Sequence, residues 1–343
     1  MMHELNGIIQ VATATLLGLV CVLLVKHSRG ALHTWTGIGF TLSILCYVVI
    51  ESDTIRSVKV LQIVAAMGAI SIPVLFWMLS RAIFDDHFKF SPPLLIWFIV
   101  IIIPHFNFFV SGLNPGSVFA QLASITARLT SLGFVLAGLY TALRTKRADL
   151  IDSRIRFRTT FIITTATLIG VTLIVEVVPI EQDTVIILQV LQRSAIFAIT
   201  FYFLLSNFGI RSGFFFKEIP KAKVPSVDDP LLNAKLQSLM EDQKIYKKEG
   251  LTIGELAELM NAQEYRLRRL INGQLGFRNF NDFLNQYRIN DACETLSDPA
   301  QVRKTILEIA YDLGYQSIGP FNKAFKDLKG HTPTSYRKTQ MNG

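Results

Sequence analysis

Four side chains in the C-terminal third of the chain have the chemistry to bind a polyanion. Tyr265, Arg266, Arg268 and Arg269 fall within five consecutive residues, and the apolar residues between and after them assign all four to the other faces of one helix. A guanidinium can donate two hydrogen bonds to a guanine edge or grip a phosphate. The net charge of +8 also suits a polyanionic partner, although a basic surplus alone is weak evidence.

Residue types for other chemistry are present without the spacing that such chemistry needs. The three cysteines, Cys21, Cys46 and Cys293, have no metal-ligand spacing, and we interpret each as a small buried hydrophobe. The six histidines form no metal motif, and no Ser-His-Asp arrangement or Gly-rich phosphate loop stands out. We therefore expect no enzyme activity, metal site or cofactor.

The elements that carry the basic residues follow a pattern that the sequence contains twice. Thr252 and Glu255 in the first copy, and Thr305 and Glu308 in the second, have the Thr-x-x-Glu spacing of a capping box. In that motif the Thr hydroxyl accepts a hydrogen bond from a backbone amide, and the Glu reaches back to the Thr amide. Each copy therefore predicts the start of a helix.

A tight turn is predicted after each of these helices. Asn261 follows the first helix and Gly314 the second, and Asn and Gly are the residues best suited to a left-handed helix C-terminus. A second helical pattern follows each turn, and a small alanine in each first helix lets the two helices cross closely. Residues 252–272 and 305–326 thus each predict a helix-turn-helix, whose second helix enters the major groove of DNA.

Residues 252–338 resemble the DNA-binding domain of the AraC/XylS family of bacterial transcription regulators. The ordered set of motifs covers about a quarter of the chain, and it is far more specific than any one of them. The residues that carry the resemblance are Glu255-Leu-Ala257, Leu267-Arg-Arg-Leu-Ile271, Phe280-Asn-Asp-Phe-Leu-Asn-Gln-Tyr-Arg-Ile289, Ile309-Ala310, Leu313-Gly-Tyr315, Phe321-Asn-Lys-Ala-Phe325 and Thr332-Pro-Thr-Ser-Tyr336-Arg337.

The resemblance implies double-stranded DNA and RNA polymerase as partners. It also implies that a long helix from about Phe280 to Leu296 connects the two units and holds their recognition helices one DNA turn apart, about 34 Å. One chain would then read two successive major grooves.

The resemblance further assigns roles in the first recognition helix. Arg269 matches the family's recurrent arginine, which we assign to a phosphate, whereas Tyr265, Arg266 and Arg268 match base-facing positions. The sequence departs from the family at Gln263, where a Ser cap is common, and this leaves the start of the helix open.

The second recognition helix is predicted to begin near a serine that is a suitable N-cap. Gly319 and Pro320 bring no hydrogen-bonding side chain, so we expect weaker base reading here than in the first unit. In both units, the alternative for each single residue is an ordinary solvated helix face. The positions assigned to DNA in the second unit are Ser317, Ile318, Gly319, Asn322 and Lys323.

A helix and a linker are predicted before the first helix-turn-helix. Residues 231–246 predict one amphipathic helix, with an apolar stripe that includes Leu232, Leu236 and Leu239. The stripe favours packing on the first helix-turn-helix over the alternative, a dimer contact. Residues 209–229 combine a Phe cluster with Lys and Pro residues, which is typical of a short semi-rigid linker.

Long apolar runs occupy the first 208 residues. Runs of this length can span a bilayer as helices, which satisfy their own backbone hydrogen bonds. Residues 1–208 hold 14 Lys and Arg with 10 Asp and Glu, whereas the shorter remainder holds 20 and 16, so the sequence predicts a lipid-embedded part and a water-soluble part. The seven runs lie at roughly 7–25, 31–50, 60–80, 92–111, 117–142, 158–180 and 184–206.

The loops between these runs differ in basic charge. Alternate loops hold ten Lys and Arg against two, and six of the ten fall between residues 144 and 158. Because cytoplasmic loops are enriched in Lys and Arg, we assign the richer set to the cytoplasm. An odd number of spans then puts the N-terminus outside and the chain from residue 209 onward in the cytoplasm, where DNA is.

Ionisable residues inside the apolar runs are costly in lipid and are therefore candidates for function. Arg128 lies in the fifth run, Glu176 in the sixth, and Gln189 and Arg193 share one face of the seventh at i,i+4 spacing. One interpretation is a sensor pocket in which Arg128 and Arg193 hold an anionic small ligand. The other is structural, with Glu176 or backbone carbonyls neutralising the arginines and locking the helices.

Together these observations predict an all-α protein: a seven-helix transmembrane sensor domain at 1–208, a linker at 209–229 and an AraC-type DNA-binding domain at 230–343. We expect a multi-pass regulator in the lipid bilayer of the bacterial inner membrane, which couples a sensed signal to gene expression. The alternatives are a membrane receptor whose C-terminal domain docks a protein partner, and a transporter-like protein or membrane enzyme with a regulatory tail. A homodimer is a further option, because two copies on adjacent DNA sites gain effective concentration.

Overall fold

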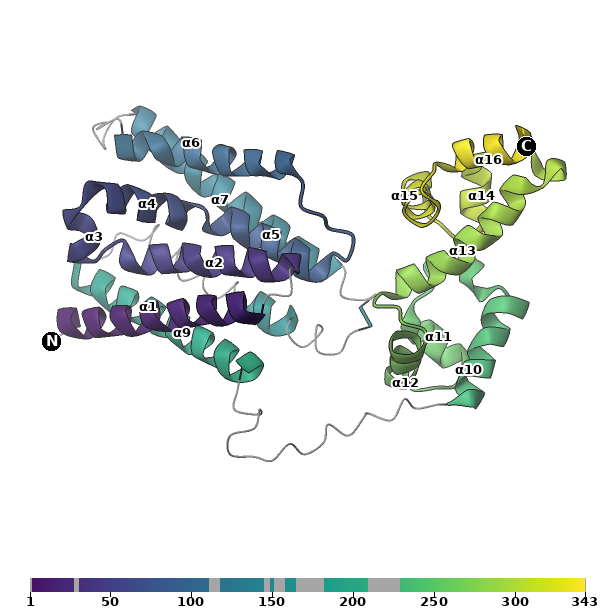
Figure 1. Ribbon diagram of the computed structural model, residues 1–343, viewed down its shortest axis with the longest axis horizontal. Coiled ribbons are helices and arrows are strands. Elements are labelled where there is room, and N and C mark those ends of the chain that lie inside the picture. The colour runs from purple at the N-terminus through teal and green to yellow at the C-terminus, as the bar shows by residue number, and fades with distance from the viewer. Residues whose placement is uncertain are drawn as a thin grey trace. The chain divides into compact units, whose positions relative to one another are not determined.

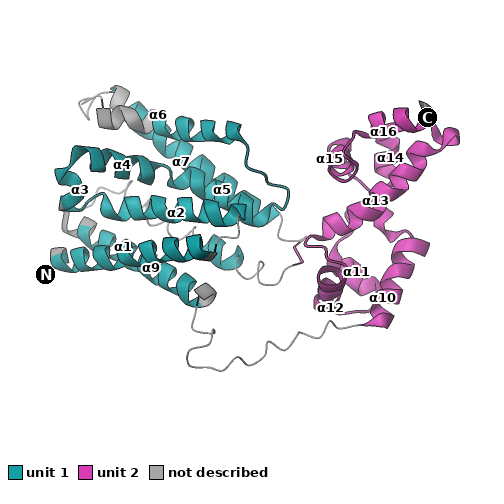
Figure 2. Cartoon of the chain, viewed as in Figure 1, with its two compact units in different colours: residues 1–145, 157–218 teal, residues 146–156, 219–343 magenta. Residues whose placement is uncertain are grey.

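The chain is helical and divides into two compact units (Figure 1, Figure 2). In the described part of the chain there is no β-strand, apart from an isolated antiparallel bridge between Asp149 and Asn279, so the all-α prediction is confirmed there. Unit 1 comprises residues 1–145 and 157–218, and unit 2 comprises residues 146–156 and 219–343. The computed structural model describes residues 2–27, 31–110, 118–144, 149–150, 158–164, 182–208 and 229–342.

The boundary between the units differs from the predicted one. Residues 146–156 group with unit 2, although the sequence places them between two apolar runs. The predicted linker at 209–229 lies outside the described residues, except for Asp229.

Unit 1 is a set of apolar helices. Among the described residues, α1, α2, α7 and α9 are long and apolar enough to cross a membrane. The helices of unit 1 are α1 (Met2–His27), α2 (Leu32–Val49), α3 (Asp53–Ser57), α4 (Lys59–Ile70), α5 (Ile72–Phe84), α6 (Ile96–Val110), α7 (Val118–Arg144) and α9 (Gln182–Phe208), with a 3-10 turn at Pro92–Leu95 and a helical segment at 158–164.

The third predicted span is divided. α4 and α5 meet at Ser71 with a bend of 44°, and Pro73 lies in the first turn of α5, where its missing amide breaks no helix bond. The fourth predicted span contains the shorter apolar helix α6, and the sixth, at 158–180, lies largely outside the described residues. The described residues thus contain four candidate spans, or five if α4 and α5 form one, against seven predicted.

The helices of unit 1 pack as a series of neighbours. α1 packs against α9 and α2, α2 against α4 and α5, and α5 against α7, which also contacts α6. The crossing of α5 and α7 is close, because an added Cβ on Gly138 would lie 2.6 Å from the ring carbon Cε1 of Phe76. Small residues at such crossings let helix backbones approach each other in lipid.

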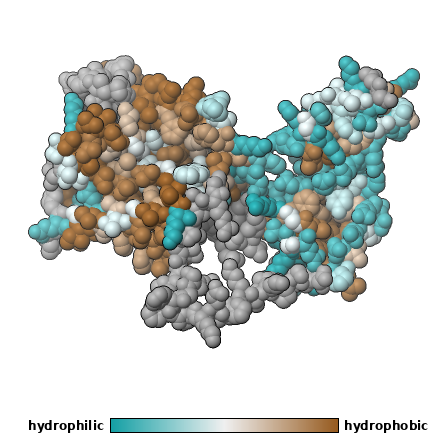
Figure 3. Space-filling view, viewed as in Figure 1, coloured by the Kyte–Doolittle hydropathy of each residue, from teal (hydrophilic) through white to brown (hydrophobic). Residues whose placement is uncertain are grey.

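The surfaces of the two units differ in polarity (Figure 3). Brown apolar side chains cover much of the described surface of unit 1, whereas unit 2 is largely hydrophilic. Many apolar side chains of unit 1 are more than half exposed; examples are Ile8 at 66%, Val60 at 68% and Val118 at 73%. Because water-soluble monomers rarely expose large contiguous apolar patches, this surface is the one expected of helices in lipid.

Unit 2 is built around one apolar core that runs through both predicted helix-turn-helix units. Its helices are α10 (Pro230–Gln237), α11 (Ile253–Leu259), α12 (Glu264–Arg269), α13 (Phe280–Ser297), α14 (Ile306–Asp312), α15 (Ile318–Lys329) and α16 (Pro333–Asn342). π-Helical turns continue α10 over Ser238–Asp242 and α12 over Leu270–Gln274, and 3-10 turns lie at Ile245–Lys247 and Pro299–Gln301.

The single helix predicted at 231–246 is interrupted. The chain turns at Lys244, whose φ of 49° is left-handed. Leu232, Leu236 and Leu239 are nevertheless buried in the core of unit 2. Their burial supports packing on the first helix-turn-helix rather than a dimer contact.

Local sequence chemistry sets the starts of the paired helices. Both capping boxes are formed, with Thr252 and Glu255 before α11 and Thr305 and Glu308 before α14 bonded in both directions. After α11, Asn261 adopts the left-handed backbone predicted for it, with φ of 47°. Short-range hydrogen bonds therefore place the turn of the first helix-turn-helix.

Candidate nucleic-acid interface

The first recognition helix is α12 with its π-helical continuation. The apolar residues of the helix are buried in the core, so its polar side chains point elsewhere. Tyr265, Arg266 and Arg269 are exposed, and 54% of Tyr265 is accessible. Gln263 occupies the N-cap position, but its side chain makes no capping hydrogen bond, so the helix starts without the cap that Ser would provide.

Two arginines of α12 are paired with acidic residues. The Arg266 guanidinium contacts the carboxylate of Asp229, which caps α10. Arg268 is held more closely: Nε lies 2.9 Å from Glu264 Oε1, Nη2 contacts the same oxygen, and Nη1 donates to the Asp149 carbonyl at 3.1 Å. Only 18% of the Arg268 side chain is accessible, against 46% for Arg266. The arginines assigned to bases are therefore not equivalent.

The second recognition helix is α15, and all of its positions assigned to DNA are exposed. Its opposite face is apolar and buried. The serine occupies the N-cap position as predicted, and its side chain makes no capping hydrogen bond. The exposed positions are Ser317, Ile318, Gly319, Asn322 and Lys323.

The long helix α13 joins the two units. It spans Phe280–Ser297, close to the predicted bounds. Figure 1 shows α12 and α15 nearly end-on, with the long helix α13 passing between them. A connecting helix that joins two recognition helices is what reading two successive major grooves from one chain requires.

An arginine that sequence reasoning missed lies at this junction. Arg288 of α13 is 8% exposed, and it donates from Nε to the Tyr246 carbonyl at 2.7 Å and from Nη2 to the Lys248 carbonyl at 3.0 Å. Its guanidinium also lies 5.1 Å from the ring centroid of Tyr315. Burial lowers the pKa of Arg288. One side chain thus connects the segment before α11, the long helix and the turn after α14.

The spacing of the sequence contains a signal for this arginine. Leu284, Arg288 and Ala292 follow one another at i,i+4 on the buried face of α13. Gly314 completes the same junction with a φ of 80° and a Cβ position 2.4 Å from the Lys247 carbonyl oxygen. A residue with a side chain would therefore be both strained and obstructed at position 314.

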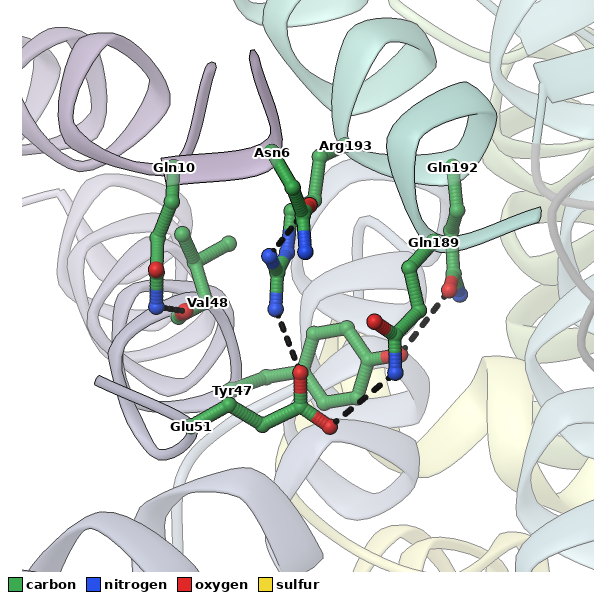
Figure 4. Close-up of polar contacts among 8 residues, drawn as sticks. All are labelled: Asn6, Gln10, Tyr47, Val48, Glu51, Gln189, Gln192 and Arg193. Atoms are coloured by element: carbon green, nitrogen blue, oxygen red, sulfur yellow. Dashed lines mark hydrogen bonds and ion pairs between the residues drawn. The ribbon is translucent and has the colours of Figure 1, made fainter. Parts of the chain in front are cut away.

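Unit 1 contains a polar cluster between α1, α2 and α9 (Figure 4). The buried Arg193 side chain donates to Glu51 at 2.5 Å and to Asn6 at 2.5 Å. Gln189 donates to the other Glu51 oxygen at 3.3 Å, so the predicted i,i+4 pair meets on one carboxylate. Sequence reasoning missed Glu51, which directly follows the second apolar run.

The other residues predicted for the sensor are not in this cluster. Arg128 is exposed on α7, which packs mainly against α5 and α6, whereas Arg193 lies on α9 against α1. Glu176 lies outside the described residues. The carboxylate that neutralises Arg193 is Glu51.

Comparisons with known proteins agree with the geometry of unit 2. The family described as "Helix-turn-helix domain" matches residues 256–339. Among solved structures, the C-terminal domain of AraT, a response regulator from Geobacillus stearothermophilus, is 32% identical, and the match covers 32% of this chain and 85% of that one with a TM-score of 0.28. No curated protein sequence matches the chain significantly.

Both matches concern the part of the chain that holds the two capped helix-turn-helix units. The AraT domain is matched over 85% of its length at 32% sequence identity. The family resemblance predicted from the motifs is therefore confirmed. This chain belongs to the AraC family of DNA-binding helix-turn-helix transcription regulators.

Proposed function

We propose that this regulator is embedded in the bacterial inner membrane, where unit 1 senses a signal and unit 2 binds double-stranded DNA in the cytoplasm. The observation that carries the proposal is the presence, in one chain, of an AraC-type domain and four helices long and apolar enough to cross a membrane. The exposed apolar side chains of those helices favour lipid over water as their surroundings.

The polar cluster of unit 1 supports the alternating helix directions on which the assignment of loop charges depends. The orientation deduced from loop charges puts the N-terminus, the end of α2 and the start of α9 on the outer side. Asn6, Glu51 and Arg193 come from these regions, and they bond to one another. The contacts thus place these helix ends together, and the loop charges assign them to the outer side.

In unit 2, we assign Tyr265, Arg266 and Arg268 to bases and Arg269 to a phosphate of the first major groove. Arg266 must exchange the Asp229 carboxylate for DNA, because its guanidinium is occupied in the free protein. The second groove receives the exposed face of α15, through Ser317, Ile318, Gly319, Asn322 and Lys323.

We assign signal sensing to the polar cluster of unit 1. The Arg193–Glu51 pair fastens α9 to the end of α2, and the Asn6 contact adds α1. An anionic small ligand would act by displacing the Glu51 carboxylate from Arg193. The Glu51 side chain is 38% accessible, so the displaced carboxylate can be solvated while the ligand pairs with Arg193, and the tie between α9 and the end of α2 is released.

Two measurements test the proposal in cells. Membranes washed with alkaline carbonate should retain the chain, because its helices are inserted rather than adsorbed. Mapping of bound DNA across the genome should give discrete sites. An Arg193→Gln variant should remain inserted and bind DNA without responding to conditions that change wild-type occupancy, whereas Arg56→Gln, at an exposed arginine of α3, should behave as wild type.

The outcomes separate the parts of the proposal. Release of the chain by carbonate would show that unit 1 is not embedded. Retention in the membrane without discrete DNA sites would favour a receptor that docks a protein partner. Loss of Arg193→Gln from the membrane would make that arginine a folding residue and remove its assignment to sensing.

A further inference from the structure

Two residues from the connection between α7 and the helical segment at 158–164 lie in the DNA-binding unit. Leu150 is 3% exposed and belongs to the core of unit 2. Its backbone N–H donates to the Arg278 carbonyl at 3.1 Å, and Asp149 forms the β-bridge with Asn279. We call Asp149–Leu150 the docking segment.

The docking segment lies against an arginine of the first recognition helix. The Asp149 carbonyl accepts from Nη1 of Arg268, while Glu264 takes Nε and Nη2. All three nitrogens of the guanidinium are therefore engaged. The neighbouring Arg266 and Arg269 remain exposed.

The docking segment is close in sequence to the last candidate span before it. Asp149 follows Arg144, the end of α7, by five residues, a distance that extended chain covers in at most about 18 Å. Arg158 ties the other end of the connection to the same helix, because its Nη1 donates to the Ala142 carbonyl at 2.9 Å. A displacement of α7 that exceeds this reach would therefore pull on the docking segment.

We propose that the docking segment is an autoinhibitory contact that competes with DNA for Arg268. While it is docked, Arg268 is withheld from the bases, and DNA is read by the remaining exposed residues. Movement of α7 withdraws Leu150 from the core and frees Nη1 of Arg268 from the Asp149 carbonyl, so that DNA has only the Glu264 contact to replace. The inference rests on the proposed function, since it takes unit 1 as the source of the movement.

The chemistry of the contact suits a reversible switch. Six Lys and Arg lie between residues 144 and 158, and unit 2 is also basic, so charge repulsion opposes docking. What holds the segment is burial of the Leu150 side chain, the backbone hydrogen bond to Arg278 and the hydrogen bond from Arg268 to the Asp149 carbonyl. Because few contacts hold the docking segment against the repulsion between basic residues, a small force on the segment is enough to undock it.

A disulfide tests the contact directly. Directly paired residues of a β-bridge have Cα atoms about 4.5–5.5 Å apart, within the range that a disulfide joins. An Asp149→Cys and Asn279→Cys double variant, with Cys21, Cys46 and Cys293 replaced by Ser, is placed in lipid nanodiscs and oxidised with copper phenanthroline. The DNA probe is a duplex selected from a random pool by the reduced protein, and binding is measured by fluorescence anisotropy.

We expect rapid cross-linking and at least tenfold weaker binding of the oxidised protein, which a reductant reverses. The matched control combines Asp149→Cys with Asn290→Cys, an exposed position on the same helix about 16 Å further along, and it should not cross-link. In the chain without extra cysteines, Leu150→Ser should strengthen binding several-fold. Leu231→Ser, at a leucine of unit 2 that is 84% exposed, should not.

Each other result overturns the proposal. Absence of the cross-link means that the segment does not dock, and cross-linking without a change in affinity means that docking does not compete with DNA. Failure of the reduced protein to select any duplex would overturn the proposed function itself, together with this inference. The two failures are therefore distinguishable by the reduced protein alone.

Discussion

The two helix-turn-helix units have the same frame and different recognition chemistry. Both begin with a complete Thr-Glu capping box and turn on a left-handed residue, Asn261 in the first and Gly314 in the second. The first recognition helix carries three arginines, of which Arg266 and Arg268 are paired with carboxylates. The second has no arginine in α15, and its positions assigned to DNA are exposed.

The two helix-turn-helix units therefore share a backbone frame without sharing a binding surface. In the proposed interface of the first helix-turn-helix, DNA would compete with Asp229 for Arg266 and with Glu264 and Asp149 for Arg268. We expect binding there to depend on the residues that hold the arginines, whereas the positions of the second helix-turn-helix assigned to DNA are already exposed. We therefore expect DNA binding by the first helix-turn-helix to be regulated, and DNA binding by the second to be constitutive.

The largest expected effect comes from breaking the junction that both units share. Arg288→Met removes the donor to the Tyr246 and Lys248 carbonyls, and it should lower the free energy of unfolding of unit 2 by about 2–5 kcal/mol. Because one core runs through both helix-turn-helix units, the backbone amides of both should lose protection from exchange together. Hydrogen exchange of the backbone amides in the intact chain measures this change.

Arg303→Met is the matched control, because Arg303 is exposed at the surface of the same unit. It should leave exchange unchanged. If Arg288→Met destabilises the second helix-turn-helix and leaves the amides of the first protected, the two helix-turn-helix units are independent domains. The shared junction would then have no energetic role.

A smaller effect separates the recognition helices. Arg266→Ala should weaken binding to the preferred duplex by about 1–3 kcal/mol and relax the base preference at one position. Lys323→Ala in α15 should reduce the salt dependence of binding by about one charge with little change in base preference. Binding curves at several salt concentrations, with a pool of single-base variants, give both quantities.

The prediction fails if the two substitutions exchange roles. A relaxed base preference in Lys323→Ala, with none in Arg266→Ala, would make the second unit the principal reader. The low affinity expected of Arg266→Ala must also be separated from loss of the Asp229 contact, so Asp229→Asn serves as the control. That variant should bind DNA at least as well as wild type, because Arg266 no longer pairs with a carboxylate.

The smallest expected effect is on the pH dependence of stability, and it comes from the capping boxes that the two helix-turn-helix units share. Glu255 and Glu308 accept the backbone N–H groups of Thr252 and Thr305 at 3.1 and 2.7 Å, and these bonds lower the pKa of both carboxyls below 4.5. A carboxyl with a lowered folded pKa stabilises the fold above its unfolded pKa and loses that contribution as the pH falls through the folded value. Stability should therefore decline below about pH 4.5 in both units.

The matched variant is Glu255→Gln with Glu308→Gln, which keeps the side-chain shape and removes the charge. Its deficit relative to wild type should be full at neutral pH and vanish as the carboxyls of the wild type are protonated. A deficit that stays constant down to pH 3 would assign the effect to geometry, and the charge of the capping boxes would have no role.

Much of unit 2 could be predicted from the sequence, because its elements are set by short-range interactions. The capping boxes, the left-handed Asn261 and the bounds of α13 depend on residues within a few positions of each other. The long apolar helices of unit 1 could also be predicted from the sequence. The bend between α4 and α5 could not, because both helices lie in one apolar run. Hydrophobic period and length give the existence of a helix more reliably than its breaks.

The family, the pair of helix-turn-helix units and the presence of long apolar helices could thus be determined from the sequence alone. These features depend on hydrogen bonds and hydrophobic spacing between residues that are close in sequence. The tertiary structure decided which charges are engaged. Arg268 meets the Asp149 carbonyl across 119 residues of sequence, and Arg193 meets Glu51 across 142. Such partners depend on how the helices pack, and no spacing rule connects residues so far apart along the chain.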